Sequence, residues 1–547
     1  MKRIAAIGFI VLAVAIAPVS RAQFTGNNQT NIISGVTSNW NGTYYVGYDK
    51  TYDQLQIVNG AALYGFDSYI GYKGSNPSSN NSVLVTGSGS VWSNWSDLHI
   101  GSLGSSGNSL VISNGGRVIN FIASVGDNGL NNNNNGVLVS GTGTLWTCGS
   151  FLRVGLGGIG NSLVISNGAT VVSGKATVGM GASNNTVLVT GPGSQWTVSA
   201  GIRVGGPGKA SLTINDGGLV VATNMDVGPA ASPGVLVVVT NSGILSIQGL
   251  ANDGYLNIFT GTFKLSGGTV TVGTLATSNG AASSIAFHGG ILSTKSSSIS
   301  NGAAFVVGNG IHTATFQLLG GAYLFVDGLQ VSTNALLTGC GTITGTVVNY
   351  GTITNDCYGG TLAVSGTVTN FGSITVPNGG LVQFNGPVVN LGTIDSSGGL
   401  LRVPGGMTNA GTLILNPNDD TDIDGIPNGY EQGHGLDPLN AADASADNDG
   451  DGFTNLQEFQ AGTSPTNSSS VFRVLSLEST NGDVLVTWQT AGGRTNVVVA
   501  ASDMAGSFTN VSPNIILPGS GDVTTNWLDA GGATNGASRY YKIRLVP

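Results

Sequence analysis

The sequence predicts an all-β protein whose main part is a right-handed parallel β-helix. Short runs rich in β-branched residues, such as VLVTG (83–87) and SLVIS (109–113), alternate with turns rich in Gly and Asn. The chain has 89 Gly in 547 residues and only 8% charged residues. The phrase GNSLVISNG occurs at both 107–115 and 160–168. A short repeated unit cannot bury an apolar face alone, so we expect each unit to form one coil that stacks on the next.

The first residues have the features of a secretory signal peptide. Lys2 and Arg3 precede an apolar run over 4–17, and small side chains, Ser20 and Ala22, stand at the −3 and −1 positions of a cleavage site. The apolar run is shorter than the roughly 20 residues that span a membrane. We therefore expect cleavage after Ala22, a mature protein without a transmembrane segment, and a secreted, extracellular or outer cell-surface location.

Residues 23–250 form the first predicted stretch of β-helix. Three Trp residues close nearly the same phrase, at NNSVLVTGSGSVW (80–92), NNGVLVSGTGTLW (134–146) and NNTVLVTGPGSQW (184–196). Pairs of an apolar residue and Gly, such as Val125–Gly126 and Val154–Gly155, recur at intervals of 23 to 30 residues. We expect coils of about 25 residues, with ladders of Val on Val and Asn on Asn and with Gly at corners of positive φ.

Residues 251–415 are predicted to continue the β-helix with a different repeat sequence. The phrases VVNYGTI (347–353), VTNFGSI (368–374) and VVNLGTI (388–394) mark units of about 20 residues. Together the two stretches predict roughly 16 coils. No sustained helical period occurs up to residue 415.

Two families share these patterns. Residues 40–230 resemble the repeats associated with type V secretion and PEP-CTERM proteins, and residues 330–415 resemble autotransporter-associated β-strand repeats. The resemblance implies a passenger-like surface protein with a β-helical stem. The shared motifs are structural and imply no catalytic chemistry.

Residues 416–470 form an acidic segment that holds 11 of the 27 Asp and Glu residues. DTDIDGIPNGYE (420–431) and DNDGDGFTNLQE (447–458) both place acids at positions 1, 3 and 5, Gly at 6, Asn at 9 and Glu at 12. This spacing lets oxygen ligands converge on calcium, with position 7 supplying a backbone carbonyl. The predicted ligands are Asp420, Asp422, Asp424, Ile426, Asn428 and Glu431 in the first loop, and Asp447, Asp449, Asp451, Phe453, Asn455 and Glu458 in the second. The alternative is a solvated acidic linker.

The acidic segment resembles thrombospondin type 3 and dockerin-like calcium repeats, including the phrase GLDP (435–438). We do not expect complete EF-hands, because Gly433 and Gly435 should break a helix after the first loop. Only the second loop has a helix candidate, at 455–461, which ends at Gly462. The resemblance implies a calcium-stiffened joint, since so few apolar residues should not form a core without metal.

Residues 471–547 regain strand patterning. Runs such as VFRVLSLES, DVLVTWQT and TNVVVAAS predict roughly seven short strands around a buried Trp488, in a small β-sandwich of the fibronectin III or immunoglobulin type. We expect Tyr540 and Tyr541 in the last strand to pack in its core.

Several function classes are disfavoured by composition. A net charge of −9 argues against nucleic acid as a partner. The sequence GLGGIG (155–160) precedes no helix, so it is expected to be a coil corner and not a dinucleotide site, and no other small-molecule cofactor is indicated. Cys340 and Cys357 can pair between adjacent coils, although we expect all three cysteines to be small buried side chains.

The predicted function is a secreted or cell-surface structural or adhesive rod, with extracellular polysaccharide or cell-envelope components as partners. A carbohydrate-binding protein is the main alternative, because Tyr44, Tyr45, Tyr48, Tyr52, Tyr64 and Tyr69 crowd the first coils. A polysaccharide-degrading enzyme would need paired carboxylates on an open face. The candidate pairs are Asp49 with Asp53 and Asp67 with Asp97, and the sequence assigns no catalytic residue.

Overall fold

The computed structural model describes residues 24–127, 129, 131–229, 234–249, 253–278 and 280–546. The chain divides into two compact units, 1–352 and 353–547. It is 52% strand and 4% helix and contains a parallel β-solenoid of about 15 turns, which confirms the predicted fold class. The predicted signal peptide, residues 1–22, lies outside the described residues.

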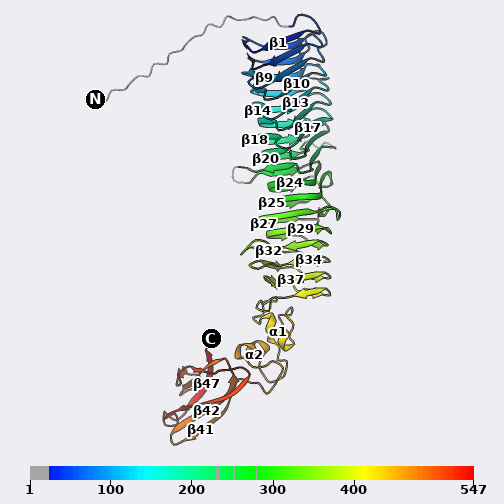
Figure 1. Cartoon of the computed structure of the whole chain (residues 1–547). Coiled ribbons are helices and arrows are strands. Elements are labelled where there is room, and N and C mark those ends of the chain that lie inside the picture. Colours follow the sequence, from blue (N-terminus) through cyan, green and yellow to red (C-terminus); the bar gives the residue numbers. More distant parts are fainter. Residues whose placement is uncertain are drawn as a thin grey trace, which may run out of the picture. The chain divides into compact units, whose positions relative to one another are not determined.

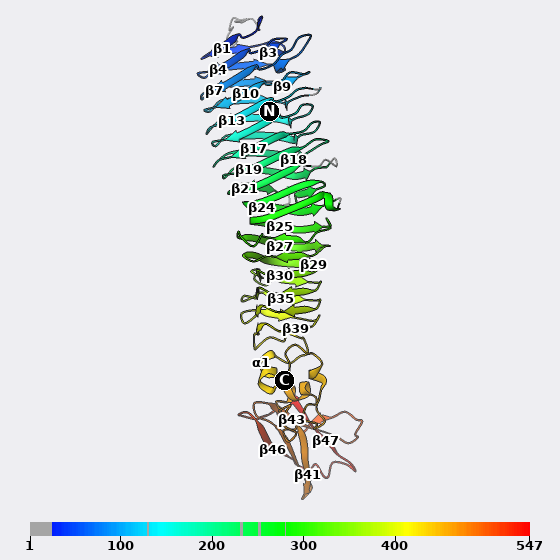
Figure 2. The same ribbon diagram turned by 90° about the vertical axis from the view of Figure 1, so that its right-hand side faces the viewer.

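The first coils of the first unit carry three strands each, and each strand pairs in parallel with its equivalent in the next coil (Figure 1, Figure 2). The first column consists of β1 (Thr30–Ser34), β4 (Gln54–Val58), β7 (Ser82–Thr86), β10 (Ser109–Ser113), β13 (Gly136–Ser140), β15 (Ser162–Ser166), β17 (Asn185–Thr190), β19 (Ala210–Asn215) and β21 (Leu236–Thr240). The second column begins with β2 (Thr37–Asn39), β5 (Ala62–Gly65), β8 (Val91–Asn94) and β11 (Arg117–Asn120), and the third with β3 (Tyr44–Tyr48), β6 (Ser68–Tyr72), β9 (Asp97–Ser102) and β12 (Ile122–Val125).

Farther along, the second and third columns merge into long strands. These are β14 (Leu145–Val154), β16 (Thr170–Val178), β18 (Gln195–Val204) and β20 (Leu219–Val227), which then separate again as β22 (Ile244–Ile247) and β23 (Tyr255–Ile258). The last coils of this unit contain β24 (Gly261–Thr277), η1 (Gly280–Ala282), β25 (Ser283–Ile299), β26 (Phe305–Val307), β27 (Ala314–Phe325), β28 (Leu329–Val331), β29 (Ala335–Thr344), β30 (Val347–Asn349) and the start of β31 (Thr352–Thr354).

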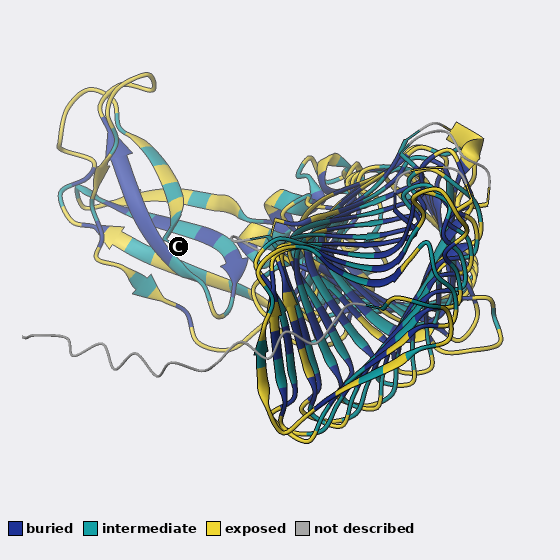
Figure 3. Cartoon of the chain, turned by 90° about the horizontal axis from the view of Figure 1, so that it is seen from above, coloured by how far each residue is buried: buried dark blue, intermediate teal, exposed yellow. Residues whose placement is uncertain are grey.

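Buried residues recur at the same places in successive coils of the solenoid (Figure 3). Trp92, Trp146 and Trp196 are fully buried in the second column. In the register, Val118 lies between the first two Trp residues and Val171 between the second and third. Trp and Val therefore alternate at this place from one coil to the next, and the sequence repeat of about 52 residues spans two coils. The smaller Val between two Trp residues leaves room for both indole rings in the core.

A ladder of buried Asn side chains runs between the first and third columns, as predicted. Asn108 donates from its backbone N and from Nδ2 to Oδ1 of Asn135, at 3.0 and 2.9 Å. The same pattern joins Asn81 to Asn108, Asn135 to Asn161 and Asn161 to Asn185. The repeated Gly makes room for each Asn: a Cβ on Gly101, which has φ +77°, would lie 2.2 Å from Asn135. The apolar–Gly pairs thus mark where the ladder passes.

The cysteines differ from expectation in part. Cys148 is free and buried, and burial raises the pKa of its thiol to about 12. Cys340 and Cys357 are disulfide-bonded, so the prediction of three simple buried thiols is wrong for these two. Sequence spacing alone did not decide between the two possibilities that it left open.

The second unit begins with short solenoid strands. These are β32 (Thr361–Val364), β33 (Val368–Asn370), β34 (Ser373–Thr375), β35 (Leu381–Phe384), β36 (Val388–Asn390), β37 (Thr393–Asp395), β38 (Leu400–Arg402), β39 (Met407–Asn409) and β40 (Thr412–Ile414). Asn370, Asn390 and Asn409 form a second ladder, with Nδ2 to Oδ1 distances of 2.7 Å at both steps. The VxNxGTI phrase is the sequence signature of this ladder.

The acidic segment contains α1 (Asn428–His434), η2 (Asp443–Ser445) and α2 (Asn455–Ala461). The prediction of α2 is confirmed, including Gly462 as its left-handed C-cap at φ +80°. The expectation that Gly433 and Gly435 would prevent a helix after the first loop is wrong. Gly433 is tolerated inside a helix of seven residues, and Gly435 ends that helix as a left-handed C-cap at φ +72°.

The C-terminal part has seven strands in two antiparallel sheets. One sheet contains β41 (Arg473–Thr480), β42 (Asp483–Ala491) and β46 (Asp522–Asp529); the other contains β43 (Thr495–Ala501), β44 (Thr509–Asn510), β45 (Ile515–Ile516) and β47 (Tyr540–Val546). Trp488 is fully buried in a core to which both sheets contribute. Tyr541 packs against this core, whereas Tyr540 is 39% exposed. The prediction that both tyrosines pack in the core is therefore correct for Tyr541 and wrong for Tyr540.

Candidate metal centres in the acidic segment

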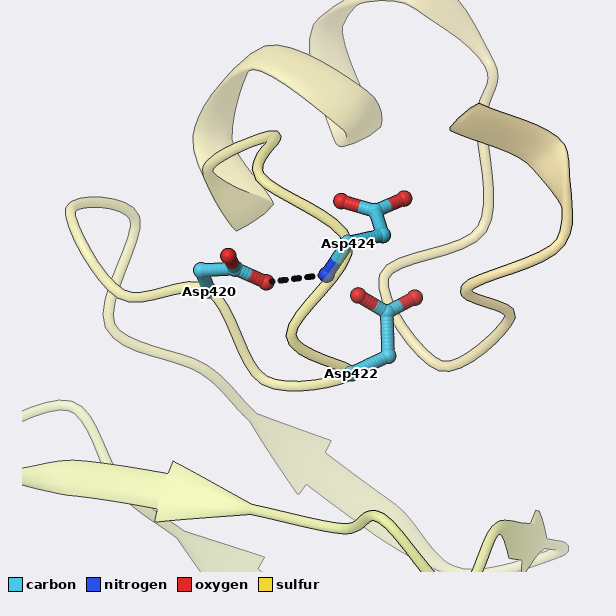
Figure 4. A group of neighbouring side chains, drawn as sticks. All are labelled: Asp420, Asp422 and Asp424. Atoms are coloured by element: carbon cyan, nitrogen blue, oxygen red, sulfur yellow. Dashed lines mark hydrogen bonds between the residues drawn. The ribbon is translucent and has the colours of Figure 1, made fainter. Parts of the chain in front are cut away.

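The first acidic loop is shaped by the side chain of Asp420. Its Oδ1 accepts a hydrogen bond from the backbone N of Asp424 at 3.2 Å (Figure 4). The same Oδ1 accepts from Ile423 N at 2.8 Å, and Oδ2 accepts from Gly425 N at 3.0 Å. Gly425 has φ +95°, which permits the tight turn that returns the chain toward Asp420. Position 1 of the loop therefore folds the loop as well as facing its centre.

The second loop repeats this geometry 27 residues later. Asp447 accepts from Gly450 N at 2.8 Å, Asp451 N at 3.2 Å and Gly452 N at 2.9 Å. Two independent copies of one hydrogen-bond pattern show that the twelve-residue spacing encodes a defined loop.

Buried carboxylates without partners meet at the first loop. Oxygens of Asp420, Asp422 and Asp424 lie within 4.8 Å of one another, and Figure 4 shows these three side chains around the loop. Glu431, at position 12, is fully buried, and Asp422 is only 7% exposed. Among the described residues, both oxygens of Asp422, both of Glu431 and Oδ2 of Asp424 have no hydrogen-bond partner.

Asp443 joins the first centre from outside its loop, and the sequence analysis missed it. One oxygen each from Asp424, Glu431 and Asp443 lies within 4.8 Å of the others. Oδ2 of Asp443 accepts from Asp437 N at 2.8 Å, while Oδ1 is buried and has no partner within the described part of the chain. Asp443 lies just before the second loop, and the repeat places Asn416 at the equivalent position of the first copy, so the spacing gave no signal for a ligand there.

The second centre has one carboxylate fewer. Asp447, Asp449 and Asp451 have oxygens within 4.8 Å of one another, and Glu458 is 1% exposed. Ser470 stands where the repeat would place the counterpart of Asp443. Its Oγ accepts from Ser464 N at 3.0 Å and donates to Asp522 at 2.5 Å.

The two position-9 Asn residues are held by backbone groups. Asn428 is fully buried; its Nδ2 donates to Asn416 O at 2.8 Å, and its Oδ1 accepts from Thr421 N at 3.1 Å. Asn455 likewise donates to Asp443 O at 2.7 Å. Their observed contacts fasten each loop to the residues before it, a role that the spacing alone did not indicate.

The position-7 residues anchor the loops through both backbone and side chain. Ile426 N donates to Asp424 Oδ1 at 2.7 Å, and Phe453 N donates to Asp451 Oδ1 at 2.9 Å. The Ile426 side chain is fully buried in a small core of the segment, together with Leu436 and Ala444. The segment therefore has an apolar core of its own, which its composition did not lead us to expect.

Burial and mutual repulsion shape the charges at both centres. Burial, and then the neighbouring Asp422 and Asp424 carboxylates, raise the pKa of Glu431 to about 8. Burial and the adjacent Asp carboxylates likewise raise the pKa of Asp422 to about 7 and that of Glu458 to about 7. Crowded buried carboxylates of this kind disfavour the ionised form unless a cation lies among them.

Other acids noted in the sequence hold the backbone. Asp49 accepts from the backbone N of Gly74, Ser75 and Asn76 at 2.6 to 2.9 Å, which lowers its pKa. Asp53 is buried and accepts from Gln29 N, while Asp67 accepts from Asp97 N at 3.1 Å.

The tyrosines of the first coils do not form one cluster. Tyr44 is buried in the core, and Tyr64 lies in the second column. Tyr45 and Tyr48 lie in the third column, where they stack on Tyr69 and Tyr72 of the next coil with centroid distances of 5.3 Å.

Comparisons with known proteins identify no relative. No protein-family model matches the chain, and no curated protein or solved structure matches it either. In the portion that the structure describes, no helix has both the length and the apolar character needed to cross a membrane.

Proposed function

We propose that the protein is a secreted or cell-surface structural or adhesive protein whose acidic segment binds two calcium ions. The observation that carries the metal assignment is the set of buried carboxylate oxygens at Asp422 and Glu431, which have no hydrogen-bond partner among the described residues. Leaving such oxygens unpaired is costly, and a cation among them removes that cost.

The donor set favours calcium over other common metals. Carboxylate oxygens, with backbone carbonyls and water to complete the shell, are hard ligands that suit calcium, which accepts six to eight of them. Zinc prefers His and Cys ligands, and neither residue type occurs in the groups of acids at the two centres. Magnesium requires a stricter octahedral shell than a flexible acidic loop usually provides.

Calcium at these centres would stiffen the second unit. Asp419, just before the first loop, pairs with Arg402 of the solenoid and accepts from Leu401 N at 2.8 Å. Arg494 of the C-terminal sheets donates to Phe459 O of α2 at 2.8 Å. A metal that orders the two loops would therefore support contacts on both sides of the segment.

The surface role follows from the solenoid and the sequence features at its start. A parallel β-solenoid presents long, regular faces and suits a structural or surface protein. The predicted signal peptide and the resemblance to autotransporter-associated and type V secretion repeats support an extracellular location. Extracellular polysaccharide or cell-envelope components are the proposed partners.

Calorimetric titration of the full mature chain with calcium tests the metal proposal. After chelator treatment, we expect two binding events, both weakened at least tenfold in the double variant Asp422→Asn, Asp449→Asn, which removes the position-3 charge of each loop. The matched control is the double variant Asp356→Asn, Asp503→Asn, which removes two charges from exposed acids outside the segment. Absence of binding heat in the parent chain, or equal binding by the Asp422→Asn, Asp449→Asn variant, would contradict the proposal.

Fractionation of expressing cells tests the location. We expect the protein outside the cytoplasm, with a mature N-terminus at Gln23 by mass spectrometry. A cytoplasmic protein that retains residues 1–22 would refute the secreted assignment.

A further inference from the structure

The third strand column of the first unit carries polar and aromatic side chains that lie in register from coil to coil. They are Tyr45, Tyr69 and His99 in the first coils and Arg153, Thr177, Arg203, Asp226 and Asn257 farther along. The buried Ser124 separates the two groups. At the start of the column the rings stack: Tyr69 lies 4.5 Å from His99, with an interplanar angle of 9°. Such a face can contact an extended ligand along several coils.

The face contains a hollow of about 480 Å³ between Phe151 and Tyr255. This volume lies within the range of about 300–1,000 Å³ that is usual for ligand sites. The two rings belong to β14 and β23, which are four coil steps apart, or roughly 19 Å. Thr177 and Asn224 provide polar groups between them.

Gly201 creates this hollow, and nothing in the backbone requires Gly there. It does not have the positive φ that would exclude other residues, and an added Cβ would meet Asn224 O at 3.5 Å, an ordinary contact. Asn224 of the next coil lies opposite Gly201. The missing side chain therefore leaves space on the face without serving the fold.

Positive charge gathers at the hollow in a chain that is poor in it. The protein has 18 Lys and Arg in 547 residues and a net charge of −9, yet Lys175 and Arg203 both line the hollow. Arg153 and Lys175 also flank the Phe151 ring, at 4.9 and 5.7 Å from its centroid. Within the described residues, the buried Nε of Arg203 has no hydrogen-bond partner.

Among the described residues, Asp226 is the one acid that lines the hollow. Burial raises its pKa, while Arg203 partly offsets this effect. The charge that a ligand would meet is therefore mainly positive.

We propose that this hollow binds a segment of an acidic polysaccharide. Sugar carboxylates would pair with Lys175 and Arg203, and sugar rings would lie on the faces of Phe151 and Tyr255. Aromatic rings at both ends favour a ring-containing ligand over an acidic peptide, and the net acidity of the chain disfavours nucleic acid. The site is independent of the calcium centres and extends the proposed surface function.

Titration of the full mature chain with oligogalacturonates of three to six units tests the proposal. A neutral oligosaccharide of equal length and linear polyglutamate serve as comparison ligands. We expect saturable binding of the oligogalacturonates and at least tenfold weaker binding of both comparison ligands. Equal binding of the neutral oligosaccharide would contradict the proposal that the ligand is acidic. Equal binding of polyglutamate would contradict the proposal that the ligand is a polysaccharide.

Variants of the hollow provide the second arm. Gly201→Gln should fill it and weaken oligogalacturonate binding at least tenfold, as should Arg203→Gln. The control Arg117→Gln removes a charge from a different strand column and should leave binding unchanged. Unaltered circular dichroism and melting temperature of the variants would exclude misfolding as the cause.

The calcium-loop variant Asp422→Asn, Asp449→Asn should still bind the sugar, which separates this site from the metal proposal. Absence of oligogalacturonate binding by the parent chain, or full binding by both hollow variants, would overturn the assignment.

Discussion

At the scale of single residues, the Asn ladder shows how a side chain without charge organises a solenoid. Oδ1 of Asn135 accepts two N–H groups from Asn108, and its own Nδ2 donates to Asn161 at 3.0 Å. Each amide therefore satisfies backbone and side-chain groups of the adjacent coil inside a dry core. Gly101 leaves the space that the Asn135 side chain occupies, so the ladder needs both the Asn and the Gly.

Removal of one Asn from this ladder should destabilise the first unit. Asn135→Ala leaves the backbone N and Nδ2 of Asn108 without their acceptor, and we expect a loss of about 2–4 kcal/mol in the free energy of unfolding. Urea unfolding of the full chain measures this loss. Asn39→Ala, an exposed Asn in β2, is the control. A similar effect of both substitutions would contradict a special role for the ladder.

Ile423 occupies a left-handed conformation that a β-branched residue rarely adopts. Its φ is +68°, and the equivalent residue of the second loop is Gly450, at +76°. Ile423→Gly should therefore stabilise the calcium-loaded protein by about 0.5–1 kcal/mol, after allowance for the greater freedom of Gly in the unfolded chain. Thermal unfolding in calcium measures the change, and Gly450→Ile should have the opposite sign. A lower melting temperature for Ile423→Gly would show that the Ile side chain contributes more than its strain costs.

Cys148 should be inert in the folded protein. Its thiol is buried, and the pKa of about 12 keeps the reactive thiolate scarce at neutral pH. We expect no alkylation by iodoacetamide at pH 8 in the native chain and one alkylated site after unfolding without reductant, as measured by mass spectrometry. Rapid labelling of native protein at Cys148 would mean that this part of the core opens readily.

At the scale of elements, the two acidic loops are copies that differ in one ligand position. Asp443 lies just before the second loop, yet its Oδ1, which has no hydrogen-bond partner among the described residues, belongs to the first centre. The corresponding Ser470 has no carboxylate and is hydrogen-bonded to Asp522. The first centre therefore has five carboxylates and the second has four, and calcium affinity rises with the charge of the ligand set.

Exchange of these two residues should change the affinities in opposite directions. Asp443→Ser should weaken the tighter calcium site by about tenfold, or ~1.4 kcal/mol. Ser470→Asp, combined with Asp522→Asn to avoid repulsion, should strengthen the weaker site. Calcium titration of the full chain resolves the two sites. If Asp443→Ser leaves both affinities unchanged, Asp443 is not a ligand.

The sequence predicted these elements unequally, for physical reasons. Alternation of apolar and polar residues was sufficient for the solenoid strands, because every coil buries the same positions. Helix α1 was not predicted because both Gly433 and Gly435 are expected to break a helix, whereas Gly435 is the C-cap at which the helix ends. Asp443 lay outside the twelve-residue window, and the hydrogen bonds of Asn428 to the preceding chain depend on burial that spacing does not reveal.

At the scale of the whole molecule, the two units should depend differently on metal. The first unit is held by strand pairing between coils, buried apolar residues and the Asn ladder, and none of these interactions requires an ion. The second unit contains the two acidic centres, whose buried carboxylates repel one another. Metal binding there would contribute directly to folding.

Chelation of calcium should therefore loosen the second unit and leave the first intact. With excess chelator, we expect limited proteolysis to cut within 416–470 at least tenfold faster and to release a stable fragment that contains the first unit. The reason is that opening of the loops relieves the repulsion among their carboxylates once no cation balances it. Calcium should protect the double variant Asp422→Asn, Asp449→Asn less than the parent chain, because the variant has lost a carboxylate charge at each centre. If chelator speeds cleavage of the solenoid equally, the metal stabilises the chain elsewhere, and the acidic segment is not its calcium-dependent joint.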